Sequence, residues 1–277
     1  MVQGIKKIER NLTAALFGPV GVLSTARIET YQSCPLKFKF KYVNKFTLQT
    51  VLSSQLVFEQ AFRRIIELAY EEKAWSKNTL SQALNFFNKQ WPGSQFINKT
   101  EGQDFKLRAE RIFALFYETQ QQGGTVIKSY PNQTISVMVD GQAVQARVDR
   151  IDEMPGRKIE LTVYDTQLNA ATEEILRTDL KYQIIWLAAT NKFKGRVNKI
   201  NCYNLEHGST TEISFTSREM ESVRQLINET QAAIQHREFT AHRGPLCGWC
   251  DCYPVCSAWN KNREKYRAYE MTIFRKA

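Results

Sequence analysis

The stretch Thr134–Ile151, TISVMVDGQAVQARVDRI, holds two runs rich in β-branched residues on either side of Asp140-Gly141. An Asp-Gly pair between such runs is a strong signal for a two-residue hairpin turn. The sequence therefore predicts two antiparallel strands, Thr134–Val139 and Ala143–Ile151. A further β-rich run, Val126–Tyr130, precedes them.

The elements on both sides of this hairpin are predicted by periodicity and by turn residues. Pro155-Gly156 marks a turn before the next strand, Lys158–Tyr164. Cys34-Pro35 interrupts the helix that Ser24 would cap, because a residue before proline leaves the helical region. The other predicted elements are, in chain order, helices over Gln55–Glu72, Ser76–Trp91, Asp104–Gln122 and Thr172–Asn191, strands near Arg196–Asn204 and Thr210–Phe215, and a helix over Ser217–His236.

This order predicts an α/β (α+β) fold with a mixed central sheet flanked by helices. No linker is evident, so we expect a single domain over residues 1–277. Within it, residues 53–124 would form a helical lobe, and residues 125–216 would form the core sheet and its helix.

The bulk properties are those of a soluble protein. The chain has 277 residues, of which 43% are hydrophobic, enough for a core that needs no disulfide. Its mean hydropathy is −0.43, and no apolar run approaches the roughly 20 residues of a membrane-spanning helix. The stretch Leu12–Val22 is broken by Gly18, Pro19 and Gly21. We therefore expect a cytoplasmic protein without membrane contact.

The formal net charge of +10 indicates an anionic partner, most often nucleic acid, although an ordinary basic surface gives the same balance. Lysines alternate with aromatic residues directly after Cys34, and a second basic run follows Cys256. The first run contains Lys37, Lys39, Lys41 and Lys45 with Phe38, Phe40, Tyr42 and Phe46, and the second contains Lys261, Arg263, Lys265, Arg267, Arg275 and Lys276. Both basic runs therefore adjoin cysteines.

Four of the six cysteines lie within ten residues, in the segment CGWCDCYPVC from Cys247 to Cys256. Such density indicates a metal, a cluster or disulfides. Disulfides need an oxidising compartment, and a four-thiolate zinc site usually takes two close Cys-x-x-Cys pairs, of which this segment has one. A 4Fe–4S cluster also takes four thiolates, and Cys34 would be its remote ligand. The residues alone leave all three open; Cys202 is expected to be a small core residue.

The stretch Leu23–Pro35, with Ser24, Arg27, Glu29, Tyr31 and Cys34 in fixed spacing, resembles the opening of the RecB-like iron–sulfur nucleases. This group includes the AddB C-terminal domain and the CRISPR-associated RecB-like exonucleases. In it, one early cysteine joins a late Cys-x2-Cys-x5-Cys around a 4Fe–4S cluster. The resemblance thus implies as ligands Cys34, Cys247, Cys250 and Cys256, and leaves Cys252 aside. Residues 237–277 would be clasped to residues 23–46.

The same resemblance implies a restriction-endonuclease-like PD-(D/E)XK core, in which a carboxylate on one strand and Asp/Glu-x-Lys on the next hold Mg²⁺ or Mn²⁺. The segment Ala146–Asp152, ARVDRID, matches the first part and implies Asp149 as the metal-binding acid. The second part is altered, because Val163 stands for the acid and Asp165 for the lysine. Further positions that depart from the family pattern are Phe62, in place of a histidine, and Tyr182 and Trp186, in place of a Gln and Tyr pair.

These substitutions predict a nuclease fold that has lost the standard reaction. Asp149 would then be a buried aspartate bonded to an arginine or to backbone amides. The alternative is a rearranged active site, in which Asp149 and Asp165 share one metal and Lys181, on the following helix, supplies the lysine. Mg²⁺ or Mn²⁺ is expected only in that second case.

The family binds DNA in a groove across the sheet, near the cluster. Arg147, Arg150 and the lysines after Cys34 would contact phosphates, while Trp249 would stack on a base or cover the cluster. The lysine–aromatic alternation locally predicts a strand, whereas the resemblance implies a helix. The aromatic residues of this run would lie either at the binding surface or in the core.

Three functions are consistent with these features. The first is an inactive DNA-binding subunit that presents single-stranded DNA or duplex ends to a partner such as a helicase, a nuclease or an integrase, in repair, recombination or CRISPR-type processing. The second is an active exo- or endonuclease with rearranged residues. The third is a protein-interaction scaffold without DNA binding. Salt-dependent DNA binding separates the third from the others, and metal-dependent cleavage separates the second from the first.

Overall fold

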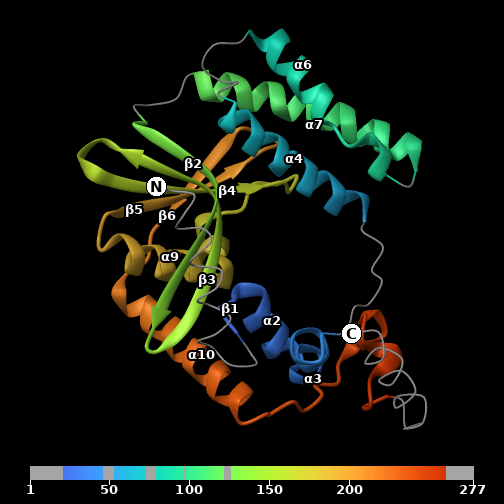
Figure 1. Ribbon diagram of the computed structural model, residues 1–277, viewed down its shortest axis with the longest axis vertical. Coiled ribbons are helices and arrows are strands. Elements are labelled where there is room, and N and C mark those ends of the chain that lie inside the picture. Colours follow the sequence, from blue (N-terminus) through green and yellow to red (C-terminus); the bar gives the residue numbers. More distant parts are fainter. Residues whose placement is uncertain (1–20, 46–52, 73–78, 97, 122–125, 260–277) are drawn as a thin grey trace. The chain divides into compact units, whose positions relative to one another are not determined.

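The computed structural model describes residues 21–45, 53–72, 79–96, 98–121 and 126–259 (Figure 1). The helix start expected at Ser76, residues 12–20, Phe46 and the basic run after Trp259 lie outside these ranges. The chain divides into two compact units. We call them the cysteine unit (residues 1–51, 138–145 and 221–277) and the core unit (residues 52–137 and 146–220), and each is described by itself.

The sheet is mixed, with the strand order β1-β3-β4-β5-β6 and with β2 paired to β3. Pairing is parallel between β1 and β3 and between β4 and β5, and antiparallel between β3 and β4 and between β5 and β6. The strands are β1 (Leu23–Ser24), β2 (Lys128–Val139), β3 (Gln142–Met154), β4 (Lys158–Asp165), β5 (Val197–Asn204) and β6 (Ser209–Ile213). This mixed sheet with its flanking helices confirms the predicted fold class.

The helices also follow the predicted order along the chain. They are α2 (Thr25–Ser33), α3 (Pro35–Phe38), α4 (Ser54–Glu71), α6 (Leu80–Gln90), α7 (Lys99–Gln121), α8 (Glu173–Thr178), α9 (Leu180–Phe193) and α10 (Ser217–Gln235). A π-helical turn over Lys39–Val43 continues α3. The lysine–aromatic run is therefore helical up to Val43, and the strand that its alternation predicts locally is not formed.

The single helix predicted over Thr172–Asn191 is divided in two at Asp179. The backbone of Asp179 is extended, with φ −77° and ψ 118°, and its carboxylate accepts a hydrogen bond from the N–H of Lys181 at 2.7 Å. An aspartate that captures a free N–H in this way begins a new helix rather than continuing the old one. As a result Lys181 lies in the first turn of α9.

The two strands predicted over Val126–Tyr130 and Thr134–Val139 form one strand, β2. Pro131 interrupts the sequence pattern between them but not the strand. Within the described sheet β2 pairs with β3 alone, and a proline, which has no N–H to donate, is tolerated in a strand with one free edge.

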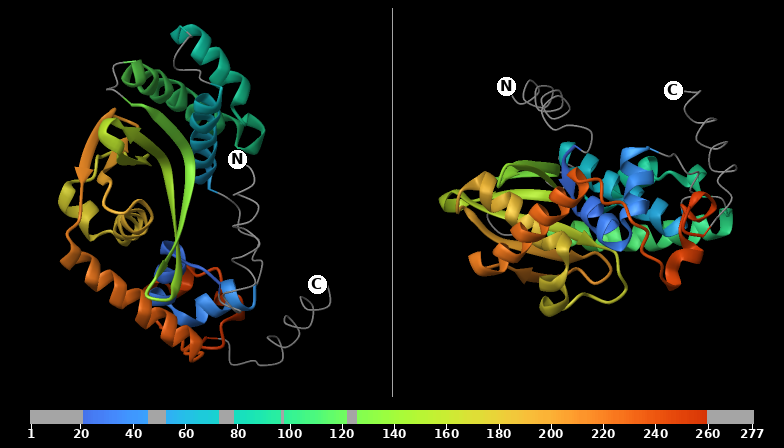
Figure 2. Two further views of the ribbon diagram at one scale, coloured as in Figure 1. Left: turned by 60° about the vertical axis from the view of Figure 1, so that its left-hand side comes forward. Right: turned by 90° about the horizontal axis from the view of Figure 1, so that it is seen from below.

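The core unit is layered, with helices on both faces of β4 and β5. Tyr164 and Tyr203 are partners in register on these strands, and both meet Phe116 of α7 edge-to-face at 5.6 and 5.5 Å between ring centroids. The preceding pair in register, Val163 and Cys202, faces the other way because side chains alternate along a strand. There the Tyr182 hydroxyl of α9 lies 3.0 Å from the Cys202 sulfur, with α9 beside the sheet in Figure 2.

The helical lobe is held together by aromatic residues. Helices α4, α6 and α7 lie together (Figure 1) and bury Phe58, Phe62, Phe87 and Phe113 completely. Phe62 stacks on Phe58 with 5.9 Å between ring centroids and meets Phe113 edge-to-face at 6.5 Å. Phe62, which stands where the resembled family has a histidine, is thus part of this core.

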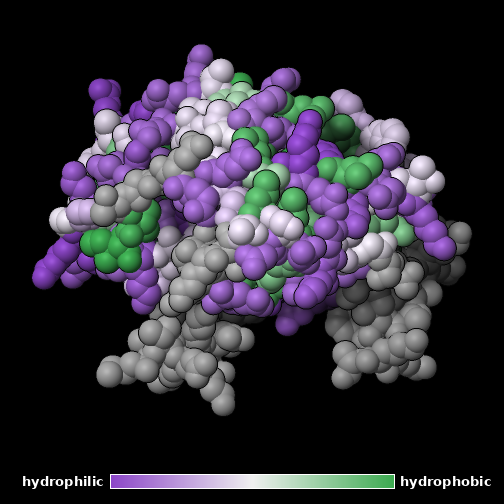
Figure 3. All heavy atoms as spheres, turned by 90° about the horizontal axis from the view of Figure 1, so that it is seen from above, coloured by the Kyte–Doolittle hydropathy of each residue, from purple (hydrophilic) through white to green (hydrophobic). Residues whose placement is uncertain are grey.

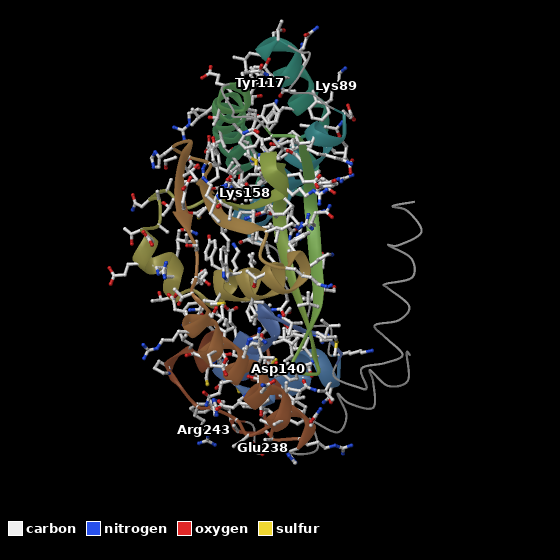
Figure 4. All side chains as sticks on the ribbon, turned by 90° about the vertical axis from the view of Figure 1, so that its left-hand side faces the viewer. Lys89, Tyr117, Asp140, Lys158, Glu238 and Arg243 are labelled. Carbon is white, nitrogen blue, oxygen red and sulfur yellow. The ribbon has the colours of Figure 1, made fainter. Side chains whose placement is uncertain are left out.

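In the cysteine unit the beginning of the described chain packs against its end. The Tyr31 hydroxyl donates a hydrogen bond to the Glu238 carbonyl at 2.6 Å, and Phe38 stacks on Phe239 with 6.3 Å between ring centroids. Phe40 is buried against Cys252. Figure 4 labels Glu238 in this unit. The segment around Cys34 and the segment from Cys247 onward therefore share one small core.

The surface shown in Figure 3 is mostly hydrophilic, with separate small hydrophobic patches. Isolated patches of this kind are ordinary for a protein surface. Among the described residues, none of the helices combines the length and the apolar character that crossing a membrane requires.

The hairpin turn gives a test of the fold. Asp140 and Gly141 both have positive φ, +49° and +83°, and the Asp140 carboxylate accepts hydrogen bonds from Arg224 and Asn228 of α10. Figure 4 labels Asp140. Asp140→Ala should lower the free energy of unfolding by about 1 kcal/mol, because alanine tolerates the left-handed region poorly. Asp140→Asn should cost less than half as much, because asparagine tolerates that region and the ion pair is exposed.

Urea unfolding of the two variants measures this difference. Equal stability losses for alanine and asparagine would show that the carboxylate contacts, not the turn backbone, carry the effect.

Candidate functional site

The first candidate site is centred on Asp149, in the part of β3 that belongs to the core unit. Its carboxylate accepts a hydrogen bond from the Tyr164 backbone N–H at 2.8 Å and forms an ion pair with Arg63 of α4. Arg63 also donates to the Tyr164 carbonyl at 2.6 Å. Asp149 is therefore bonded to an arginine and to a backbone amide, as expected for a fold that has lost the standard reaction.

Arg63 is held at this position by charge. Burial lowers the pKa of the Arg63 guanidinium, but the Asp149 carboxylate, with a smaller contribution from Glu59, outweighs burial and raises the pKa above its ordinary value. The side chains of Arg63 and Asp149 are 23% and 11% exposed. In a pair this enclosed, each charge compensates the other. Arg63 thus supplies Asp149 with the positive charge that a metal ion would otherwise provide.

The residues around Asp149 do not fit Mg²⁺ or Mn²⁺. These ions need several oxygen ligands, usually more than one carboxylate. Val163, where the second acid is expected, is buried and has no ligand atom, and Asp149 is already neutralised by Arg63. Within the described ranges, no three His, Cys, Asp or Glu side chains are grouped so as to hold one metal ion.

Asp165 and Lys181, the other residues of the proposed rearranged site, differ in where they lie. One Asp165 carboxylate oxygen accepts from the Gln167 N–H at 3.0 Å, and the other accepts from Asn204 of β5 at 3.4 Å. Asp165 therefore interacts with the end of β5. Lys181 lies near Asp149: burial lowers the pKa of its amine, Arg63 lowers it further, and Asp149 opposes both.

Arg63 is the residue that the sequence analysis missed. It stands one position after Phe62 and four after Glu59, whose carboxylate accepts from the Thr166 hydroxyl at 2.9 Å. A Glu and an Arg four residues apart on one helix are usually a surface pair. The sequence does place an arginine, Arg63, beside the position of the family's histidine. Only the fold shows that Arg63 reaches Asp149.

The second candidate site is a cavity of about 470 Å³ in the cysteine unit. The cavity is lined by the four cysteines that the sequence singles out, namely Cys34, Cys247, Cys250 and Cys256. Cys34 lies at the break between α2 and α3, where Pro35 forces the backbone to be extended. The other three lie on two short 3-10 turns, Pro245–Trp249 and Tyr253–Val255, or directly after them. All six cysteines of the chain are free thiols.

Four thiols around one cavity are the donor set of either a 4Fe–4S cluster or a four-thiolate zinc ion. Each cysteine of a 4Fe–4S cluster binds a different iron, so the thiols need to surround a volume rather than converge on one point. The Gly244 N–H donates to the Cys247 sulfur at 3.3 Å, a contact of the kind that stabilises cluster sulfurs. Cys252 also lines the cavity, but its side chain is buried against Phe40 and Val255.

The residues expected to bind nucleic acid lie in different surroundings. Lys37 and Lys39 are half-buried, and Lys41 and Lys45 are exposed. The intervening Phe38 and Phe40 are fully buried, so these two aromatic residues form core. Trp249 lines the cavity and is 88% exposed.

Arg147 and Arg150 differ in the same way. Arg147 is exposed and donates to Asn132 at 3.1 Å. Arg150 is enclosed: it pairs with Asp152 at 2.8 Å and also donates to Gln120 at 3.2 Å. Arg150 thus compensates the buried Asp152 carboxylate, and its contact with phosphate stays a prediction.

Comparison with known proteins agrees with this fold. Residues 22–257 match the model of the PD-(D/E)XK nuclease superfamily, whose members generally use Mg²⁺ or Mn²⁺. A crystal structure of a Eubacterium rectale protein, named "Putative exonuclease", aligns over 84% of this chain and 87% of that one, with TM-score 0.54 and 11% identity. The crystal structure of SSO0001 aligns over 92% and 94% of the two chains at 13% identity, but its TM-score of 0.37 is too low to bear on the fold.

No curated protein matches the sequence. The family match nevertheless covers most of the chain, from just before β1 to just after the last cysteine. This chain belongs to the PD-(D/E)XK nuclease superfamily.

Proposed function

We propose that this protein is a catalytically inactive, DNA-binding member of the superfamily, with a structural 4Fe–4S cluster of the RecB-like group. It presents DNA to a partner enzyme, such as a helicase, a nuclease or an integrase, in repair, recombination or CRISPR-type processing. The observation that carries the proposal is the ion pair between Arg63 and Asp149.

The ion pair supports inactivity through charge balance. A metal-dependent nuclease needs carboxylates whose negative charge is free to attract a divalent cation. Here the Arg63 guanidinium neutralises the Asp149 carboxylate. The pKa of this guanidinium is raised, so Arg63 keeps its positive charge at every physiological pH. Val163 supplies no second acid, and the position of the family's lysine holds the carboxylate of Asp165.

The arrangement of the cysteines supports the cluster. Four thiols from opposite ends of the sequence line one cavity, and none is bound in a disulfide. Zinc remains the competing occupant, since it also takes four thiolates. The iron–sulfur assignment rests on the Cys-x2-Cys-x5-Cys spacing with a remote Cys34.

The distribution of charge supports DNA binding. In the sequence, eight of the ten net positive charges lie in the segments 1–51, 138–145 and 221–277. Six of these eight lie outside the described ranges, and the described part of the cysteine unit has a net charge of +2. The basic segments that adjoin the cysteines in sequence would make the main contact with the DNA backbone.

One observation favours the second candidate, an active nuclease with rearranged residues. Lys181 lies close enough to Asp149 for the two charges to affect each other. A lysine beside a carboxylate is part of the superfamily's catalytic set, and here it comes from α9 rather than from β4.

A cleavage assay separates the two candidates. The protein, incubated with single-stranded and duplex DNA and Mg²⁺ or Mn²⁺, should release no products above those of a heat-inactivated sample, because no free carboxylate pair can bind the metal. Cleavage that disappears in both Asp149→Ala and Lys181→Ala would contradict inactivity and establish the rearranged site.

The cluster has its own test. Anaerobically purified protein should be brown, with a broad visible absorption band and four iron and four sulfide per chain. Cys34→Ser should lose most of the iron, because the cluster needs Cys34 as its fourth ligand in addition to the three cysteines of the segment Cys247–Cys256. The matched control Cys252→Ser should keep it, since Cys252 is packed in the small core instead. A colourless protein with one zinc would overturn the assignment.

A further inference from the structure

Cys252 has no place among the four proposed ligands, yet it lies beside one of them. The Tyr253 N–H donates a hydrogen bond to the Cys250 carbonyl at 2.8 Å and so closes a turn around Asp251. Across this turn a side-chain hydrogen bond joins the thiols of Cys250 and Cys252. Both residues line the cavity, and Cys250 packs against the small core that contains Cys252. The turn thus holds an additional thiol in contact with a ligand.

The spacing of these two cysteines suits a disulfide. Even in a fully extended strand, Cα atoms two residues apart are separated by roughly 6.6 Å, and disulfides join Cα atoms up to roughly 6.8 Å apart. The turn at Asp251 shortens this separation, and the hydrogen bond between the thiols shows that the sulfurs face each other. Cys250 and Cys252 can therefore be joined within the existing turn.

The thiol of Cys247, the other neighbour of Cys250, is directed elsewhere. Its sulfur accepts a hydrogen bond from the Gly244 N–H at 3.3 Å and donates one to the His242 carbonyl at 3.8 Å. These contacts hold the Cys247 sulfur to the segment that precedes it. Cys252 is accordingly the better placed partner for Cys250.

The two thiols of the turn differ in exposure. Cys252 is only 4% exposed, whereas Cys250 is partly exposed at the cavity wall. A reagent that enters from solvent therefore meets Cys250 first, and the sheltered sulfur of Cys252 lies directly beside the product.

We propose that Cys252 is a resolving thiol: when the ligand site is empty, a small disulfide such as oxidised glutathione converts Cys250 and Cys252 into a reversible disulfide. The Cys250 sulfur attacks the small disulfide, forms a mixed disulfide and releases one glutathione thiolate. The Cys252 sulfur then attacks the Cys250 sulfur, and the second glutathione leaves. The two cysteines lose two protons and two electrons, which oxidised glutathione takes up as it becomes two thiols. The inference rests on the proposed function only in taking Cys250 as a ligand.

This disulfide would control whether the site can be filled. It withdraws Cys250 from the four ligands, so a cluster or a zinc ion cannot bind until the bond is reduced. A disulfide that closes so short a loop is strained and readily reduced, so that ordinary cellular thiols restore the site. Cys252 thereby protects Cys250 from irreversible oxidation while the site is empty.

The test uses the full chain, stripped of metal by a chelator under reductant and then desalted without oxygen. An equimolar amount of oxidised glutathione should lower the six free thiols by two, with a mass loss of two hydrogen atoms. Digestion on the N-terminal side of Asp251 leaves Cys250 and Cys252 on different peptides, so their disulfide appears as two joined peptides. Iron and sulfide should rebuild the site only after dithiothreitol has reversed the change.

Variants identify the resolving thiol. Cys252→Ser and Cys252→Ala should keep glutathione on Cys250, a mass gain in place of the loss, because nothing resolves the mixed disulfide. The matched control Cys202→Ser, whose sulfur contacts Tyr182 in the core unit, should form the disulfide as the natural protein does. Thermal midpoints verify that the variants are folded.

Two results would overturn the inference and leave the proposed cluster standing. One is a lasting mixed disulfide in the natural protein, which would show that Cys252 does not reach Cys250. The other is a disulfide between Cys247 and Cys250, which leaves the peptides on either side of Asp251 separate. A protein purified with neither iron nor zinc would instead contradict the proposed cluster, while the glutathione test, made on metal-free protein, still decides the role of Cys252.

Discussion

The ion pair between Arg63 and Asp149 is the interaction on which the core unit's chemistry depends. It joins α4 of the helical lobe to β3, and the bonds of both side chains to the backbone of Tyr164 extend it to β4. Three elements thus meet at the point where an active member of this superfamily would hold its metal. Under the proposed function, the pair makes a structural contact where an active member would bind a cation, and it gives Asp149 a role that needs no metal.

The cysteine unit depends on a different constraint, the joining of segments far apart in sequence. The segment after β1 and the last described segment share a small core around Phe38, Phe40 and Tyr31, and between them they line the cavity with cysteines. Under the proposed function this unit holds DNA, and the proposed cluster would fix its geometry.

The sheet, the order of the helices and the hairpin at Asp140-Gly141 could be predicted because each rests on local pattern. The break between α8 and α9 at Asp179 could not be predicted. The helical periodicity continues through Asp179, and the break comes from its carboxylate, which caps the N–H of Lys181. The cysteine grouping was predictable from spacing. The role of Arg63 was not, since nothing in an i, i+4 pair with Glu59 tells which residue of a distant strand the guanidinium reaches. The partners of Arg150 could not be predicted for the same reason: they come from α4, α7 and β3.

The most direct test of this account is the effect of Asp149→Asn on the free energy of unfolding, with Asp165→Asn as the control. If Asp149 balances Arg63, removing its charge leaves an enclosed guanidinium unpaired and should lower stability by about 3 kcal/mol. Among the described residues, the hydrogen bonds to Asp165 come from neutral groups, so Asp165→Asn should cost about 1 kcal/mol or less. Unchanged or increased stability in Asp149→Asn would contradict the account, because a carboxylate kept free for a metal destabilises the fold that carries it.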